Sequence, residues 1–291
     1  MTAGGAARRV LVASTRVGSE RTLVETRPLV AALRARGVDA AEHPWDDAGV
    51  DWAGADLVVV RTTWDYTGRL DAFLAWAAAV DRATVLRNPL DVLRWNSHKA
   101  YLVELAGAGV PTVPTRLVRC GALGPGAGAD PVALLGAGPL VIKPAVSAGG
   151  RDTRRGDATE LAGPFARLVA DEDVLVQPLV EEIGREGEVS LIRLGDAWSH
   201  AVRKVPGAGG FLVHERHGGQ LHDHTPTPRE IAVAEAALAH APSPVAAARV
   251  DLVRIDGEPV VMELELIEPE LFLRRAPGAA DRLADALLAS V

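Results

Sequence analysis

The chain has 291 residues, enough for about two domains, and its 48% apolar and 24% charged residues are typical of globular proteins. The formal net charge of −7 argues against general nucleic-acid binding, which needs a basic surface. Cys120 is the only cysteine, so no internal disulfide can form, and we expect a reducing cytoplasmic location. No apolar run approaches the ~18 residues of a membrane-spanning helix, so we expect small-molecule partners.

The first ninety residues alternate between strand and helix patterns. Buried strands are predicted at RRVLVAS, ADLVVVR and TVLRNP, and helices at about residues 22–36 and 70–83. The alternation predicts an open parallel sheet covered by helices, which we assign to an N-terminal domain of residues 1–94. Ligands of such sheets gather at the carboxyl ends of the strands, where RTTWDY (61–66) lies. That segment is either a recognition loop or a helix N-terminus packed by its aromatic residues.

The remaining two thirds mixes helices with antiparallel hairpins. We expect a helix beginning near Trp95, buried strands in PLVIKP and VLVQPLV, and a hairpin over 187–206 that turns at Gly195-Asp196. A second hairpin contains the acidic strand, and an Ala/Leu-rich helix closes the chain, either as core or as the contact of a homodimer. The predicted class is α/β with an α+β C-terminal part, divided into a central subdomain (95–180) and a C-terminal subdomain (181–291).

In the second hairpin, acidic and apolar residues alternate. Glu263 and Glu265 point to one face, about 7 Å apart. If the turn has three residues (256–258), Asp251 pairs with Glu263 and Arg249 with Glu265, so that three carboxylates share this face. A two-residue turn shifts the register by one and scatters them. The clustered arrangement suits Mg²⁺ held together with phosphates, and the alternative is a solvated face with ordinary ion pairs.

Cationic and small residues precede this hairpin. Lys143 ends a buried strand and is followed by Ser147, Gly149 and Gly150, beside which backbone N–H groups can approach phosphate oxygens. The strand VLVQPLV offers Gln177 and the backbone beyond it to the edge of a purine. The P-loop and dinucleotide-binding glycine signatures are both absent from these segments, which disfavours an NAD(P)-dependent oxidoreductase.

The order of these features along nearly the whole chain resembles the ATP-grasp superfamily, which includes glutathione synthetase and D-alanine–D-alanine ligase. The resemblance implies three lobes: a Rossmann-like parallel sheet, a small central α+β lobe and a C-terminal antiparallel sheet with helices. It implies ATP between the last two, bound by Lys99 of NSHKAYL, Lys143, Ser147, Gly149, Gly150, Gln177, Pro178, Leu179, Val180, Glu188 and Arg203. At the ribose Glu181 or Glu182 is an alternative to Glu188, and at the phosphates Lys204 is an alternative to Arg203.

The metal pattern is the most specific part of the resemblance. The family uses an Asp followed later by Glu-x-Asn, and here Asp251 stands twelve residues before Glu263, with Glu265 in place of the Asn. The resemblance implies Mg²⁺, as two ions among these three carboxylates that bridge phosphate oxygens. The replacement keeps an oxygen ligand but adds a charge, which leaves the metal preference open.

The reaction implied by the resemblance is carboxylate activation. ATP phosphorylates a carboxylate, and an amine attacks the acyl phosphate to give an amide-type bond, ADP and phosphate. The catalytic candidates are cations that neutralise the transferred charge: Lys143, Arg203 and Arg249.

Three segments narrow the resemblance further. RTTWDY, NPLDVLRWNSHKAYL and ELELIEPELF are most similar to a small bacterial group that includes the cyclo-ligase forming D-cycloserine from O-ureido-D-serine. In that case the acceptor or amino-acid site is lined by Thr63, Trp64, Asp65, His214, His217, Gly218 and Glu268.

Other interpretations fit parts of the sequence. A Mg-ATP-binding protein without a ligase step would carry the same acidic hairpin, and an NAD(P)-dependent oxidoreductase would use the N-terminal sheet. His217, His222 and His224 with Asp223 are a candidate transition-metal site, although their spacing matches no firm ligand signature.

Overall fold

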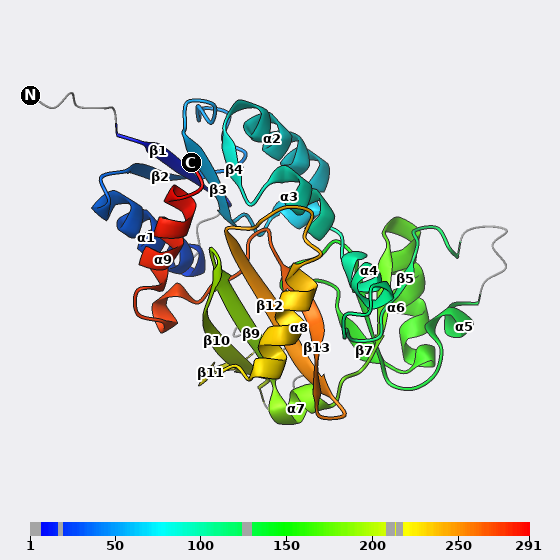
Figure 1. The fold of residues 1–291 in the computed structure, drawn as a ribbon. Coiled ribbons are helices and arrows are strands. Elements are labelled where there is room, and N and C mark those ends of the chain that lie inside the picture. Colours follow the sequence, from blue (N-terminus) through cyan, green and yellow to red (C-terminus); the bar gives the residue numbers. More distant parts are fainter. Residues whose placement is uncertain (1–6, 17–19, 124–129, 208–212, 214–217) are drawn as a thin grey trace, which may run out of the picture.

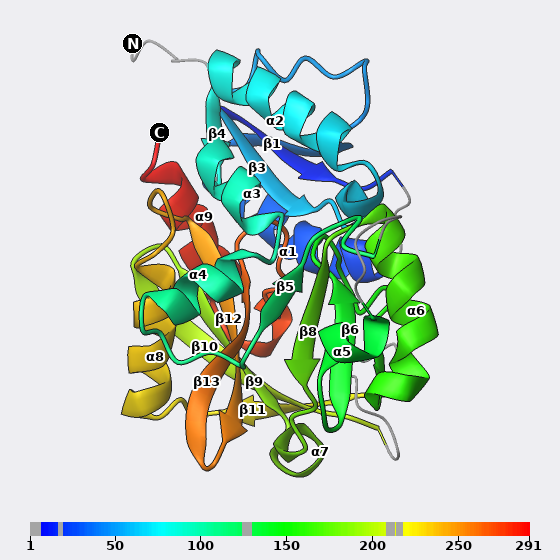
Figure 2. The same ribbon diagram turned by 90° about the vertical axis from the view of Figure 1, so that its right-hand side faces the viewer.

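The computed structural model describes the chain except residues 1–6, 17–19, 124–129, 208–212 and 214–217. The described strands form three sheets, one in each of three lobes (Figures 1 and 2). This arrangement confirms the predicted class, with a parallel sheet first and antiparallel sheets after it.

The N-terminal lobe is a parallel sheet in the order β2-β1-β3-β4. Its strands are β1 (Arg9–Ser14), β2 (Asp39–Pro44), β3 (Leu57–Thr62) and β4 (Val85–Arg87), with helices α1 (Glu20–Ala35), α2 (Leu70–Ala83) and α3 (Leu90–Asn96) and the 3-10 turn η1 (Tyr66–Gly68). Alternate residues of β1 face opposite sides, because side chains alternate along a strand. Val10 and Val12 pack with α1, whereas Leu11 and Ala13 pack in the cluster that includes α2. The sheet is therefore covered on both faces, as its continuous apolar strands predicted.

The helix predicted near Trp95 is two shorter helices. α3 ends at Asn96, and α4 (Tyr101–Gly107) begins after a break that contains Lys99. At the break the Lys99 backbone N–H donates to Ala145 O at 2.8 Å, which ties this segment to the central lobe. The break turns the Lys99 side chain toward the interior instead of along a continuous helix.

The central lobe is an antiparallel sheet in the order β5-β8-β6-β7. Its elements are β5 (Arg116–Val118), α5 (Pro131–Leu135), β6 (Leu140–Pro144), β7 (Arg154–Gly156), α6 (Ala158–Asp171) and β8 (Val174–Pro178). A capping box of Asp157 and Glu160 starts α6, and Phe165 and Val169 on its inner face are fully buried against the strands. The buried residues of this cluster all lie between Val118 and Val176, so the lobe has a core of its own.

The C-terminal lobe is an antiparallel sheet in the order β11-β10-β9-β12-β13. Its elements are α7 (Glu182–Glu186), β9 (Glu188–Leu194), β10 (Ala197–Val205), β11 (Gln220–His224), α8 (Pro228–Leu238), β12 (Ala247–Ile255), β13 (Glu258–Glu265), the 3-10 turn η3 (Leu273–Arg275) and α9 (Ala279–Leu288). The first hairpin turns at Gly195-Asp196, as predicted. Helix α8 lies across one face of the sheet (Figure 1).

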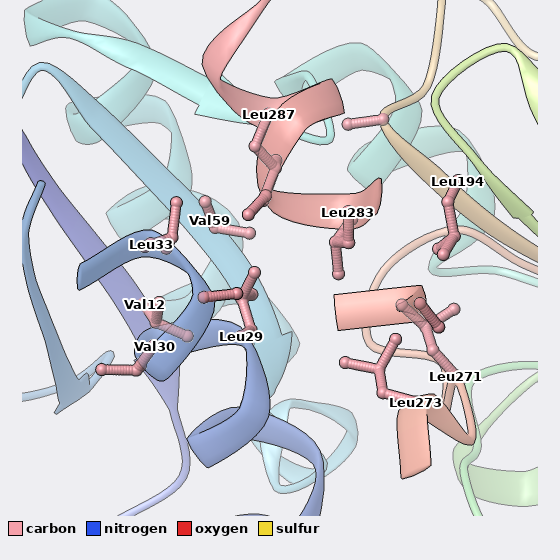
Figure 3. Packing of buried hydrophobic residues seen from close by; sticks show 14 of the residues in the cluster. Val12, Leu29, Val30, Leu33, Val59, Leu194, Leu271, Leu273, Leu283 and Leu287 are labelled. Carbon is pink, nitrogen blue, oxygen red and sulfur yellow. The ribbon is translucent and has the colours of Figure 1, made fainter. Parts of the chain in front are cut away.

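The last helix belongs to the core. Leu283 and Leu287 of α9 pack with Leu29 and Leu33 of α1 in one buried cluster that also includes Leu194 of β9 (Figure 3). At its edge Arg36 pairs with Asp281 at 2.8 Å and with Asp285 at 2.6 Å. The N-terminal and C-terminal lobes therefore share a hydrophobic core.

Candidate active site

The turn of the acidic hairpin differs from the prediction. It has two residues, Asp256 and Gly257, with φ of 53° and 81°, and Ile255 pairs with Glu258 across it. Two consecutive left-handed residues match the twist of a two-residue hairpin, and Asp-Gly is a favoured pair there. The predicted three-residue turn was therefore wrong.

A bulge in β13 restores the predicted pairing. Leu252 pairs with Val261, but the next pair is Asp251 with Glu263, so Met262 is the extra residue. Beyond the bulge Arg249 lies opposite Glu265, and the three carboxylates share one face as expected.

This face forms one wall of a cavity of about 290 Å³ between the central and C-terminal sheets, which we call the first cavity. Almost all residues predicted for ATP line it: Lys99, Lys143, Ser147, Gly149, Gly150, Gln177, Pro178, Leu179, Val180 and Glu188. The acidic residues Asp251, Glu263 and Glu265 line it as well. The structure thus brings the two predicted sets together around one space.

Lys143, at the end of β6, is a buried cation that lines this cavity. Within the described part of the chain its ammonium forms no hydrogen bond and no ion pair. Burial lowers the pKa of Lys143, and the charge of Glu263 opposes that shift in part. A buried cation without a counter-ion is costly, so this position favours an anionic ligand.

Lys99 joins the two walls of the cavity. Its Nζ donates to Ser147 O at 2.5 Å and lies 2.9 Å from Oε1 of Glu263. Burial alone would raise the pKa of Glu263, but the charges of Lys99 and Lys143 hold it below its usual range. Glu263 is therefore an ionised carboxylate facing the cavity.

Asp251 is the most buried of the three carboxylates. Its oxygens accept from Ser190 Oγ at 2.5 Å and from Arg249 Nη2 at 2.9 Å, and Lys204 Nζ lies 3.3 Å from Oδ2. Burial opposes ionisation of this group, but Arg249 and Lys204 outweigh it and hold the pKa of Asp251 well below its usual range.

Arg203 does not belong to this site, which corrects the sequence prediction. It is exposed and lines a separate hollow on the other face of the sheet, with Val189 and Arg254. Its neighbour Lys204 is buried and pairs with Glu188 and Asp251. Side chains alternate along β10, so only one of the two adjacent cations can face the cavity.

The loop after Lys143 is built to approach a ligand closely. Gly149 and Gly150 have φ of 60° and 75°, a conformation that favours glycine, and both line the first cavity. Opposite them, Gln177 Nε2 donates to Thr115 Oγ1 at 2.8 Å. The backbone N–H of Leu179 is taken by Pro139 O at 2.9 Å, so it is not available to a purine as the sequence had implied.

A second cavity of about 140 Å³ adjoins the first and shares Lys99, Ser147, Gly149, Glu263 and Glu265 with it. Its other walls include Trp64 and Tyr66 of the N-terminal lobe, Arg249 of β12, and Glu268 and Glu270 from the segment after β13. Arg249, a predicted catalytic cation, donates to Asp251 and Glu265 and to Glu270 O at 3.3 Å. Trp64 and Glu268, both predicted for the substrate site, thus line the same cavity.

Carboxylates outnumber cations around the second cavity. Burial raises the pKa of Glu265 to about 7, with Arg249 opposing and Glu263 adding to the shift. Burial, with the charge of Glu265, raises the pKa of Glu268 to about 8. This excess of negative charge fits a bound cation.

Other predicted substrate residues do not line either cavity. Asp65 accepts from Trp45 Nε1 at 3.0 Å and pairs with Arg69, and these contacts direct its carboxylate away from both cavities. Thr63 is fully buried and lines neither cavity. Gly218 lies beside Gly207, just before β11 begins. His214 and His217 lie outside the described residues.

The histidine-rich segment has other contacts. His224 Nε2 lies 2.9 Å from Glu230, and Asp223 pairs with Arg275 at 2.8 Å. In the described residues, no group of three or more His, Cys, Asp or Glu side chains is positioned to hold a metal. The acidic wall would therefore have to exchange contacts with Lys99, Lys204 or Arg249 for metal contacts, although its oxygen donors suit Mg²⁺.

Sequence reasoning missed the residues that support the acidic strand. β13 is an edge strand, and Asn96 satisfies its outer backbone groups by donating to Leu264 O and accepting from Leu266 N, both at 2.8 Å. Tyr101 Oη accepts from Leu264 N at 3.1 Å. The side chains of Asn96 and Tyr101 both line the second cavity. Their closeness to Lys99 in the sequence was the signal that could have identified them.

Comparison with known proteins identifies the family. The chain is 36% identical over 284 residues to the cycloserine biosynthesis protein DcsG of Streptomyces lavendulae, covering 89% of this chain and 91% of that protein. The chain belongs to the DcsG family. Residues 10–88 also match the family described as the N-terminal domain of D-cycloserine synthetase DcsG.

Solved structures agree with this assignment. The crystal structure of D-cycloserine synthetase DcsG superposes with a TM-score of 0.85 at 32% identity, covering 97% of this chain and 99% of that one. The D-alanine–D-alanine ligase of Bacillus anthracis in complex with ATP has a TM-score of 0.69 at 15% identity, covering 97% of both chains, which shows the shared ATP-grasp fold.

The chain is therefore an ATP-dependent ligase that joins a carboxylate to an amine, as the resemblance predicted. Neither the oxidoreductase nor the non-catalytic ATP-binding interpretation matches this family. No helix among the described residues is both long and apolar enough to cross a membrane.

Proposed function

We propose that this ligase phosphorylates the carboxylate of a small amino-acid-like substrate and that a nitrogen of the same molecule then displaces phosphate to close a ring. In the formation of D-cycloserine from O-ureido-D-serine, that nitrogen is the ureido nitrogen bonded to oxygen, and water also cleaves its carbamoyl group, which leaves as CO2 and NH3. The name of the relative from Streptomyces lavendulae supports this choice of product. The small volume of the second cavity, about 140 Å³, supports a substrate of amino-acid size.

One observation carries the proposal. The ammonium of Lys143, which has no partner among the described residues, faces the same cavity as Asp251, Glu263 and Glu265, and the second cavity opens beside them. A triphosphate in the first cavity supplies the missing anion for Lys143. Its terminal phosphoryl group then lies near the shared wall, next to a carboxylate in the second cavity.

The roles of the remaining residues follow from their positions. Gln177 and the segment 178–180 bind the base, and Ser147, Gly149 and Gly150 cover the phosphates. Glu181, which is exposed and lines the first cavity, fits the ribose better than Glu188, which is paired with Lys204. Lys204 replaces Arg203 in the set of phosphate-side cations.

Asp251, Glu263 and Glu265 would hold two Mg²⁺ ions, which when bound supply charge neutralisation for phosphoryl transfer. Arg249 holds Asp251 and Glu265 in place and adds a positive charge near the acyl oxygen. Closure of the loop at Gly149 over the phosphates excludes water, which would otherwise hydrolyse the acyl phosphate.

The division of the chain into lobes, its cellular location and its oligomeric state are also part of the proposal. We place the lobe boundaries at residues 94 and 180, and we expect a cytoplasmic enzyme. Because α9 is used in the core, a homodimer would need another surface.

The test is ADP release by purified protein with Mg-ATP and O-ureido-D-serine, with mass spectrometry of the product. The expected result is ADP release that depends on the substrate, together with a cyclic product. Substrate-independent ATP hydrolysis, or an uncyclised product, would refute the proposed reaction.

A further inference from the structure

Glu268 differs from the other carboxylates around the second cavity. It is only 9% exposed and lines this cavity. Glu263 pairs with Lys99, and Glu265 pairs with Arg249. Among the described residues no cation pairs with Glu268, and its carboxyl accepts only from its own backbone N–H. A buried, unpaired carboxylate in a cavity wall favours a cationic ligand.

The backbone that carries Glu268 is fixed by a buried ion pair. Arg61 and Glu25 are both almost fully buried, and Arg61 Nη2 lies 3.2 Å from Glu25 Oε2. Arg61 Nη2 also donates to Pro269 O at 3.1 Å. The Leu271 N–H donates to Glu25 Oε2 at 2.7 Å.

Trp64 holds the same segment of main chain, since its Nε1 donates to Glu268 O at 3.0 Å. The main chain from Glu268 to Leu271 is therefore held by the N-terminal lobe. A side chain held in this way loses little conformational entropy when it binds a ligand.

We propose that Glu268 binds the protonated amino group of the substrate, which makes the second cavity selective for carboxylates that carry an ammonium group. This inference rests on the proposed function and defines its substrate class. Trp64 and Tyr66 add aromatic surface beside Glu268, which further favours a cation.

The position of Glu268 also separates the two ends of the substrate. Lys99, Ser147 and Gly149 form the wall shared with the first cavity, and we place the substrate carboxylate there. The ammonium then lies toward Glu268. While the proton stays on this nitrogen, the nitrogen has no lone pair and forms no bond to the acyl phosphate. Ring closure is thus left to the ureido nitrogen bonded to oxygen, which displaces phosphate, and hydrolysis removes its carbamoyl group as CO2 and NH3.

The experiment measures binding without turnover. Calorimetry in the presence of Mg²⁺ and a non-hydrolysable ATP analogue compares O-ureido-D-serine with the analogue in which hydrogen replaces the amino group. The wild type is expected to bind the amino form about 10- to 100-fold more tightly, as for a hydrogen bond between charged groups. Glu268→Gln is expected to lose this preference, and Glu268→Asp to keep part of it.

Two controls distinguish the loss of this subsite from a general loss of structure or of nucleotide binding. Affinity for the ATP analogue is expected to stay unchanged in Glu268→Gln, and Glu258→Gln at the exposed hairpin turn is expected to bind both substrates like the wild type. Equal binding of the two substrates by the wild type, or an unchanged preference in Glu268→Gln, would overturn the inference. Preferential binding without substrate-dependent ADP release supports the subsite and refutes only the proposed reaction.

Discussion

The raised pKa of Glu268 has a measurable consequence for stability. Burial and the charge of Glu265 raise this pKa from 4.5 to about 8. Between these two values the folded protein holds a proton that the unfolded chain has released, so folding becomes less favourable as the pH rises. For this group alone the loss between pH 5 and pH 7 is about 2.5 kcal/mol, close to one proton over two pH units.

Glu268→Gln removes the titrating group and keeps the shape. We therefore expect the variant to gain stability over the wild type, and this gain to grow by about 2.5 kcal/mol from pH 5 to pH 7. The assay is urea unfolding at several pH values, with a chelator and without nucleotide, since bound ligands would stabilise the folded state. Below about pH 4.5 the effect of this group vanishes, because it is protonated in both states.

The control is Glu258→Gln, which lies at the exposed turn and is expected to follow the pH dependence of the wild type. A stability difference between Glu268→Gln and the wild type that is flat with pH, or that shrinks as the pH rises, would refute the reasoning. Either result would mean that the carboxyl is solvated or paired in the folded protein.

Three further outcomes are expected. Lys204→Met should raise the KM for ATP about tenfold or more because it leaves Glu188 without its cation and Asp251 with Arg249 alone, whereas Arg203→Met should leave it unchanged. Lys143→Ala and Glu263→Gln should each lower kcat by about 100-fold while circular dichroism remains that of the wild type. Removal of Mg²⁺ by a chelator should abolish ADP release, and added Mg²⁺ should restore it.

Each of these three predictions would be contradicted by a specific result. Equal effects of Lys204→Met and Arg203→Met on the KM for ATP would mean that the alternation of side chains along β10 does not decide which of the two cations contributes to the ATP site. Wild-type turnover in Lys143→Ala would remove the main support for the phosphate position. Full activity in the chelator would refute the metal role of the acidic wall.

Local patterns predicted much of the fold. The apolar spacing of residues 70–83 defined α2 at both ends, because helix periodicity is a local property. The alternation of strands and helices indicated the parallel sheet for the same reason. The break between α3 and α4 was missed, since it depends on contacts of Lys99 and Asn96 with distant segments.

The candidate site was predictable where residue type alone decides the chemistry. Asp251 and Glu263 were found from their spacing, although the bulge at Met262 had to compensate for the mistaken turn. The choice between Arg203 and Lys204 needed the register of β10, which the sequence leaves open by one residue. Asp65 was misassigned because its partners Trp45 and Arg69 are brought to it by the fold.

The separate core of the central lobe decides which parts of the enzyme can move during a catalytic cycle. The other two lobes are fused through α1 and α9, so the acidic wall and the Glu268 side of the second cavity stay in one rigid block. The lobe carrying Lys143 and the glycine loop can swing away from that block with its own core intact, and the motion breaks the contacts of Ala145 and Leu175 with the C-terminal lobe. A hinge motion of the small lobe would then open the nucleotide cavity and also withdraw Ser147 and Gly149 from the wall of the second cavity, while the side of that cavity formed by Glu268 stays in place.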